Sequence, residues 1–331
     1  MNNGKPKIRL LSILLILLIA YGATGSFQTV AAWSDGGQSI DSNHIQYGTH
    51  DWIAEHALHL LPSNESGWLT SNRNIFLLGT EAPEYGNVSF KGRNGYGDIE
   101  NHHNYYSGRF PRDCFDDSAA VRAEQEFQKA LLCLRNSSYD LAAWYAGAMT
   151  HYISDVGSWP HVISNATPSH ASKYEEQLNL ITDDYSKNPE FLLSWAWMLN
   201  SFNTTLSVSV ETAYSVSLMQ GLEVYCDGGG YHPCGPHPAA TMDAQFQDSW
   251  SSVDDWPLIY QARVGYSMTD TIMSVAYALH SLTVEAELTG ASGGSTPSQL
   301  PTLTFAIVFI AVFGVMAVVA AFAYSERRRP R

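Results

Sequence analysis

Positive charge is scarce in this chain of 331 residues, which has 18 lysine and arginine residues against 32 aspartate and glutamate residues. Seven of the basic residues and only one acidic residue lie in the end segments, before residue 33 and after residue 290. Residues 33–290 therefore have a net charge near −20. Because binding to nucleic-acid phosphates needs clustered lysine and arginine, an extended nucleic-acid surface is disfavoured. Bound divalent cations would offset part of this charge.

Several motifs of common enzyme classes are also missing. The sequence has no glycine-rich phosphate loop and no Cys-x-x-Cys pair. No repeat or low-complexity block interrupts residues 33–290. This stretch has the length of one domain and can bury a full core without disulfides.

Long apolar runs occur only at the two ends of the chain. Residues 1–32 begin with basic residues, continue with an apolar run and finish in Val30-Ala31-Ala32, small residues of the kind that signal peptidase prefers. They predict a secretory signal peptide, so that the mature chain begins at Trp33.

The second apolar run, residues 303–324, has 22 uncharged, mostly apolar residues, enough to span a bilayer of about 30 Å. Four arginines follow in the tail 325–331, which predicts that this basic tail is cytoplasmic. Residues 290–302 are rich in Gly, Ser, Thr and Pro and predict a flexible linker. We therefore expect a single-pass protein of the cell surface, with residues 33–289 as an extracellular domain.

The chain has only four cysteines, Cys114, Cys133, Cys226 and Cys234. An even number in an exported chain suggests two disulfides, and the neighbour pairing Cys114–Cys133 and Cys226–Cys234 is the simplest of three connectivities. Glycosylation sequons fit the same export prediction; they lie at Asn64, Asn87, Asn136, Asn165 and Asn203.

Apolar periodicity predicts a mainly helical domain. Residues 84–117 and 226–240 show no apolar periodicity and are predicted to be loops. Loops of this length in a compact domain are usually functional or held in place by contacts. We expect an all-α domain whose loops converge on a site. The expected helices cover residues 50–61, 118–134, 139–156, 174–185, 190–200, 204–225 and 257–288.

The sharpest local motif is His151-Tyr-Ile-Ser-Asp155, followed by Pro160-His161. His151 and Asp155 are four residues apart, so both side chains leave one face of a helix. A nitrogen ligand beside a carboxylate suits zinc. Pro160 ends the helix, so His161 can turn back toward the same metal cluster. Each of these residues alone has a structural explanation, but the three together indicate a metal site.

A free N-terminus would add a further ligand. Cleavage after Ala32 exposes the α-amine of Trp33, and an N-terminal amine can chelate a metal together with its own carbonyl oxygen.

Taken together, these residues resemble the zinc-dependent phospholipase C family, which shares its fold with S1/P1-type nucleases. The family has an all-α domain that binds three zinc ions. Mature members of the family begin with a tryptophan that is itself a zinc ligand. The family's His-x3-Asp-x5-His motif is complete in this sequence. The matching positions are Trp33, His50 in Thr-His-Asp-Trp-Ile, Glu84 in Gly-Thr-Glu-Ala-Pro-Glu, His103 in His-Asn-Tyr-Tyr, His151, Asp155 and His161, and His170 and Glu175 in His-Ala-Ser-Lys-Tyr-Glu.

This sequence departs from the family pattern at two of these places. Glu84 stands where aspartate is usual, and Glu81 competes with it. His170 and Glu175 are five residues apart instead of four, which separates them by about 140° around a helix. Glu176 is therefore an alternative to Glu175. His102 is likewise an alternative to its neighbour His103 as the histidine ligand before the aromatic pair.

The resemblance implies how three zinc ions would be held. His151, His103, Glu84 and Asp155 would bind the first, and Asp155 would bridge to a second held by Trp33 and His50. The third would be held by His161, His170 and Glu175. Glu84 and Asp155 are the residues we expect at the catalytic water.

The expected activity is zinc-dependent phosphodiester hydrolysis of the phospholipase C kind, on a phospholipid or another phosphodiester. One alternative is an S1/P1-type nuclease or nucleotidase on the same scaffold. Another is a non-catalytic, metal-stabilised binding domain. Two further histidines near His50, His56 and His59, are expected to be surface or core residues, and the sequence indicates no protein partner.

Overall fold

The computed structural model describes residue 33, residue 37 and residues 39–98, 100–106, 114–163, 171–187, 212–227 and 238–290. The chain divides into two units, residues 1–285 and 286–331. Of the second unit, the structure describes only residues 286–290, which end the last helix.

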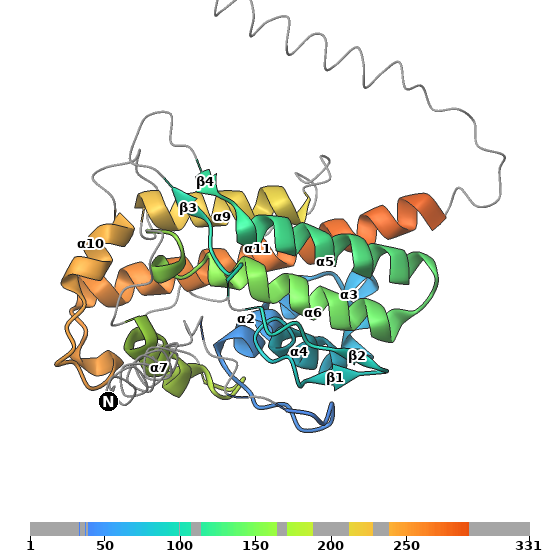
Figure 1. The fold of residues 1–331 in the computed structure, drawn as a ribbon, viewed down its shortest axis with the longest axis horizontal. Coiled ribbons are helices and arrows are strands. Elements are labelled where there is room, and N and C mark those ends of the chain that lie inside the picture. Colours follow the sequence, from blue (N-terminus) through green and yellow to red (C-terminus); the bar gives the residue numbers. More distant parts are fainter. Residues whose placement is uncertain are drawn as a thin grey trace, which may run out of the picture. The chain divides into compact units, whose positions relative to one another are not determined.

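The described chain is mainly helical, as predicted (Figure 1). Four short strands form two antiparallel pairs within the stretch expected to be a loop: β1 (Ser89–Phe90) with β2 (Arg93–Asn94), and β3 (Tyr105–Tyr106) with β4 (Cys114–Asp116). The helices are α2 (Thr49–Leu60), α3 (Ser63–Thr70), α4 (Arg73–Glu81), α5 (Ser118–Arg135), α6 (Tyr139–Asp155), α7 (Ala171–Thr182), α9 (Ala213–Asp227), α10 (Pro238–Gln245) and α11 (Leu258–Gly290), with 3-10 turns η1 (Trp159–His161) and η2 (Val253–Asp255).

Most of the expected helices lie close to their predicted positions. The helices expected at 50–61, 118–134 and 139–156 are α2, α5 and α6, and the segment 257–288 forms the single long helix α11. The short helices α3, α4 and α10 were not predicted, because eight or nine residues give little periodicity to detect. The helix expected at 190–200 lies outside the described residues.

Helices α4 and α6 approach each other through two glycines. A Cβ atom on Gly147 of α6 would lie 2.0 Å from the carbonyl oxygen of Phe76 and 2.8 Å from the Cα of Gly79, both on α4. Only glycine permits this separation of two helix backbones. The contact fixes α6 beside α4 one turn before the His151–Asp155 motif.

The core around these helices is built from large aromatic side chains. Trp52 of α2, Phe76 of α4, Phe127 of α5 and Trp144 of α6 are fully buried, as is Trp159 of η1 within 1%. Burying an aromatic side chain removes a large apolar area from water, so these contacts hold the ligand-bearing helix ends in place.

The predicted pairing of Cys114 with Cys133 is wrong. Both cysteines are free thiols in the structure. Cys114 lies in β4, before α5 begins, whereas Cys133 lies in the last turn of α5, about 22 Å along the helix from Ser118. A disulfide needs Cα atoms within about 7 Å. Cys226 is buried on α9, and its predicted partner Cys234 lies outside the described residues.

Within the described part of the chain, no helix is long and apolar enough to cross a membrane. The predicted signal peptide, residues 1–32, and the predicted span, residues 303–324, lie outside that part.

Candidate metal centre

The start of α2 carries His50 and is anchored by its neighbour Asp51. One oxygen of this carboxylate accepts the backbone N–H of Gly48 at 3.1 Å, which caps the helix. The other accepts the hydroxyl of Thr80 on α4 at 2.9 Å. These bonds tie the first turn of α2 to α4, so the fully buried His50 side chain is held in the interior.

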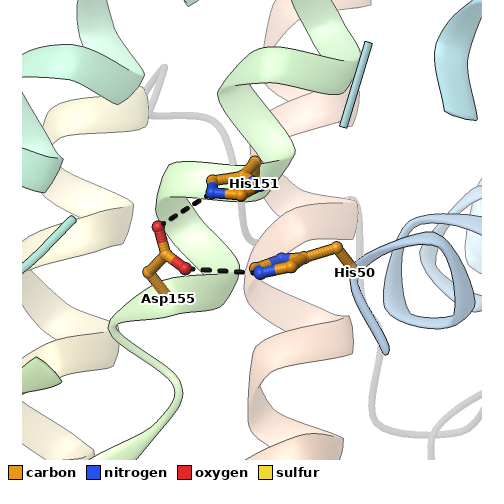
Figure 2. Close-up of side chains that lie close together, drawn as sticks. All are labelled: His50, His151 and Asp155. Atoms are coloured by element: carbon orange, nitrogen blue, oxygen red, sulfur yellow. Dashed lines mark ion pairs between the residues drawn. The ribbon is translucent and has the colours of Figure 1, made fainter. Parts of the chain in front are cut away.

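Asp155, the last residue of α6, lies between two histidines (Figure 2). Its Oδ1 is 3.3 Å from His50 Nε2, and its Oδ2 is 3.3 Å from His151 Nε2. All three side chains are fully buried, and one ligand atom from each lies within 4.8 Å of the other two. The two oxygens of one carboxylate therefore face ligands from two different helices.

The structure favours His102 over His103 as the next member of the cluster. His102 Nδ1 is 2.8 Å from Asp155 Oδ2 and 3.1 Å from His151 Nε2. His103 instead places its Nε2 3.0 Å from Asp116 Oδ2 and stacks on Tyr105. His102 is buried and His103 is only half-buried, so the two neighbouring histidines have different surroundings.

A second pair of ligand types meets nearby. His161 reaches the interior through the η1 turn after α6, and its Nε2 is 3.4 Å from Oε1 of Glu175 on α7. Both side chains are almost fully buried, whereas Glu176 is exposed. The structure thus brings Glu175, and not Glu176, to His161. His170 lies outside the described residues.

Glu84 is half-buried just after α4, and its charge raises the pKa of both His102 and Glu175. It therefore lies near both groups of ligands. Glu81, its competitor, is buried and accepts the backbone N–H of Ser39 at 2.6 Å. The structure favours Glu84 for the site.

Trp33 is fully buried, and its side chain interacts with Tyr174, the residue that precedes Glu175. The first residue of the predicted mature chain is thus placed beside the helix that carries Glu175.

The protein groups alone leave this site electrostatically unbalanced. Burial raises the pKa of Glu175 well above its usual value, and the charges of Glu84 and Asp155 raise it further. Burial also lowers the pKa of His161 to about 4 and holds that of His151 well below its usual value. Burial opposes ionisation of Asp155 too, but His151 and His102 keep its pKa well below the usual value. Buried carboxylates and histidines are stabilised together by bound cations.

The described residues at this site fit zinc. Two ligand atoms on a tetrahedral zinc with bonds of about 2.0–2.1 Å lie about 3.3 Å apart. The His50–Asp155, His151–Asp155 and His161–Glu175 distances, 3.3, 3.3 and 3.4 Å, have this spacing and are long for hydrogen bonds. Within the described part of the chain, buried polar atoms at the site lack hydrogen-bond partners: both ring nitrogens of His50, Asp155 Oδ1, His161 Nε2 and both oxygens of Glu175.

The helical fold and a buried site of histidines around a shared carboxylate define a zinc-dependent metalloprotein. A family model described as zinc dependent phospholipase C matches residues 49–216, just over half of the chain. The protein therefore belongs to the zinc-dependent phospholipase C family, whose chemistry is phosphodiester hydrolysis, and the predicted resemblance is confirmed.

Among solved structures, alpha toxin from Clostridium absonum is similar, with 16% identity and a TM-score of 0.46. The match covers 76% of this chain and 65% of that chain, so it spans less than two thirds of the toxin. No curated protein matches the sequence.

Proposed function

We propose that this protein is a membrane-anchored, extracellular phospholipase C that uses three zinc ions. The observation that carries this proposal is the position of Asp155, whose two oxygens face His50 on one side and His102 and His151 on the other. A carboxylate in this position can bridge two metal ions. Membership of the family supplies the reaction class.

The ligand sets that we propose follow the family pattern, with His102 in place of His103. His102, His151, Asp155 and Glu84 would hold the first zinc, and Asp155, His50 and the amine and carbonyl of Trp33 the second. His161 and Glu175, together with His170, would hold the third. When bound, zinc supplies Lewis-acid activation of water and of phosphoryl oxygens near neutral pH.

The residues of the chain provide the remaining chemistry. Glu84 is only half-buried and lies near both ligand groups, so its carboxylate is our candidate to accept the proton of the attacking water. Its side chain is one methylene longer than the aspartate usual in the family, which changes the placement of the accepting oxygen. Asp155 and Glu175 are buried, so bulk water is kept from their carboxylates, which would strengthen their electrostatic interaction with bound zinc.

A nuclease or nucleotidase on the same scaffold is the alternative. The net charge near −20 of residues 33–290 opposes a long polyanion but not a small nucleotide. The deciding experiment measures zinc per chain in the purified mature protein and compares hydrolysis of phosphatidylcholine vesicles with that of single-stranded DNA and of a nucleotide. Zinc-dependent release of phosphocholine with little DNA cleavage supports the proposal. Preferential DNA or nucleotide cleavage would favour the alternative, and zinc binding without any hydrolysis would favour a binding domain.

We expect the mature N-terminus to be Trp33, because Val30-Ala31-Ala32 is a typical signal-peptidase site. The burial of Trp33 and its interaction with Tyr174, the neighbour of Glu175, support this expectation. N-terminal sequencing checks the cleavage site. One alanine added before Trp33 should lower the zinc content by one ion per chain, since the amine is moved out of reach. Trp33→Phe with an unchanged mature start keeps the amine and should keep that ion. A mature chain that starts elsewhere would remove Trp33 as a chelating terminus.

The proposed anchor makes a separate prediction. With residues 303–324 in the membrane and residues 33–289 outside, protease added to intact cells should cut near the linker 290–302 and release a soluble, active domain. The short linker would also raise the effective concentration of the enzyme at lipid substrates. If the domain stays protected until the cells are lysed, the proposed orientation is wrong.

A further inference from the structure

The imidazole of His102 is held from both sides. Its Nδ1 faces Asp155 Oδ2 and His151 Nε2 at 2.8 and 3.1 Å. Its Nε2 donates a hydrogen bond to the backbone carbonyl of Asp98. Because a carbonyl oxygen can only accept, this bond places a proton on Nε2 and leaves Nδ1 directed at the ligand cluster.

Asp98 lies in the loop between β2 and β3, and its carboxylate ties this loop to two helices. Its Oδ2 accepts Nε of Arg122 on α5 at 3.0 Å and the hydroxyl of Tyr152 on α6 at 3.1 Å. Its Oδ1 accepts the side-chain amide of Asn101 at 2.8 Å. Its backbone N–H donates to the carbonyl of Pro83 at 2.7 Å, next to Glu84. One residue thus links the segments that carry His102 and Glu84.

The cation that holds Asp98 is itself fixed. The Arg122 guanidinium lies over the rings of Tyr96 and Tyr152, 4.9 and 5.1 Å from their centroids. Its Nε and one terminal nitrogen also reach the Tyr152 hydroxyl, at 3.1 and 3.0 Å. The side chains of Arg122 and Asp98 are only 19% and 12% exposed, so water screens their ion pair weakly. Since Tyr152 follows His151 directly, the clamp attaches to the same helix turn as the ligands.

We propose that Asp98 is a positioning residue of the zinc centre. Arg122 and Tyr152 fix its carboxylate, and its own backbone carbonyl orients His102 so that Nδ1 is the metal ligand. Histidine ligands generally donate their second ring N–H to a carbonyl or carboxylate, and disturbing that partner typically lowers metal affinity about 10–100-fold. The inference rests on the zinc site of the proposed function but not on its substrate, because its readout is metal affinity.

The first test measures zinc affinity by competition with a chromophoric chelator, for the wild type, Asp98→Ala and Asp98→Asn. Asp98→Ala should weaken one zinc about 10–100-fold. Asp98→Asn should recover part of the loss, because its amide oxygen can still accept from Tyr152 and Arg122. Circular dichroism checks that helical content is kept.

A double-variant comparison then separates positioning from general destabilisation. If Asp98 acts through His102, Asp98→Ala should cause no further loss of zinc affinity in a His102→Ala background. Arg73→Met is the matched control. Arg73 also holds a buried carboxylate, that of Glu55 at 2.5 and 2.7 Å, and its loss should leave zinc affinity unchanged.

The outcomes distinguish this inference from the proposed function. Wild-type zinc affinity in Asp98→Ala, or an additive loss in the double variant, would overturn the inference alone. A wild-type protein that binds no zinc would overturn the inference and the proposed function together.

Discussion

Asp155→Asn is expected to lose more than one zinc per chain and nearly all hydrolysis. The substitution keeps the size of the side chain but removes the charge that faces His50 on one side and His102 and His151 on the other. One of its two former oxygens becomes an N–H donor, which cannot ligate a metal. Loss of a single electrostatic contact in an active site already costs about 10²–10³ in rate, so we expect a loss on the order of 10³. Metal analysis and phosphodiesterase assays measure the two effects.

Two controls show whether this effect belongs to the site. Asp140→Asn makes the same chemical change in the first turn of the same helix, where the partner is the exposed Lys91, and should keep all zinc. His56→Ala removes a buried histidine that packs on Trp52 and Tyr185, and it should cost stability but not metal. Full zinc content and full activity in Asp155→Asn would end the trinuclear interpretation, because a bridging carboxylate could not be replaced by an amide without loss of metal.

The second large effect is expected from Gly147→Ala. The new Cβ would lie 2.0 Å from the Phe76 carbonyl and 2.8 Å from the Cα of Gly79, so two helix backbones would have to separate. Overpacking usually costs about 1–3 kcal/mol, and a clash with backbone that no rotamer can relieve places this variant at or above the upper end. Because α6 carries His151 and Asp155, both the zinc affinity and the free energy of unfolding should decrease. Denaturant unfolding with and without a chelator measures both.

Gly67→Ala is the matched control for this prediction. Gly67 lies in helix α3, and an added Cβ meets nothing within 4 Å. Alanine there should raise the free energy of unfolding by about 0.5–1 kcal/mol, the usual gain over glycine inside a helix. If Gly147→Ala unfolds at the same denaturant concentration as the wild type, the close α4–α6 contact is not required.

The helical character of the domain and the central motif were accessible from the sequence, because both depend on local spacing. Apolar residues at helical intervals placed α5 and α6 within about a residue of their observed ends. His151 and Asp155, four apart, had to share one helix face, and the structure brings them together. The pairing of Cys114 with Cys133 failed because proximity along the chain was taken for proximity in space, although a long helix lies between them.

The sequence by itself determined which residue types and spacings were available for a zinc site, since these follow from helix geometry and ligand chemistry. Only the tertiary structure decided between neighbours such as His102 and His103, because the direction of each side chain depends on distant partners. Asp98, clamped by Arg122 and Tyr152, turns His102 inward, while Asp116 binds His103. No motif marked Asp98, whose effect on the site passes through a backbone carbonyl that every residue type possesses. Contacts of this kind arise from packing between helices far apart in the chain, and local spacing does not encode them.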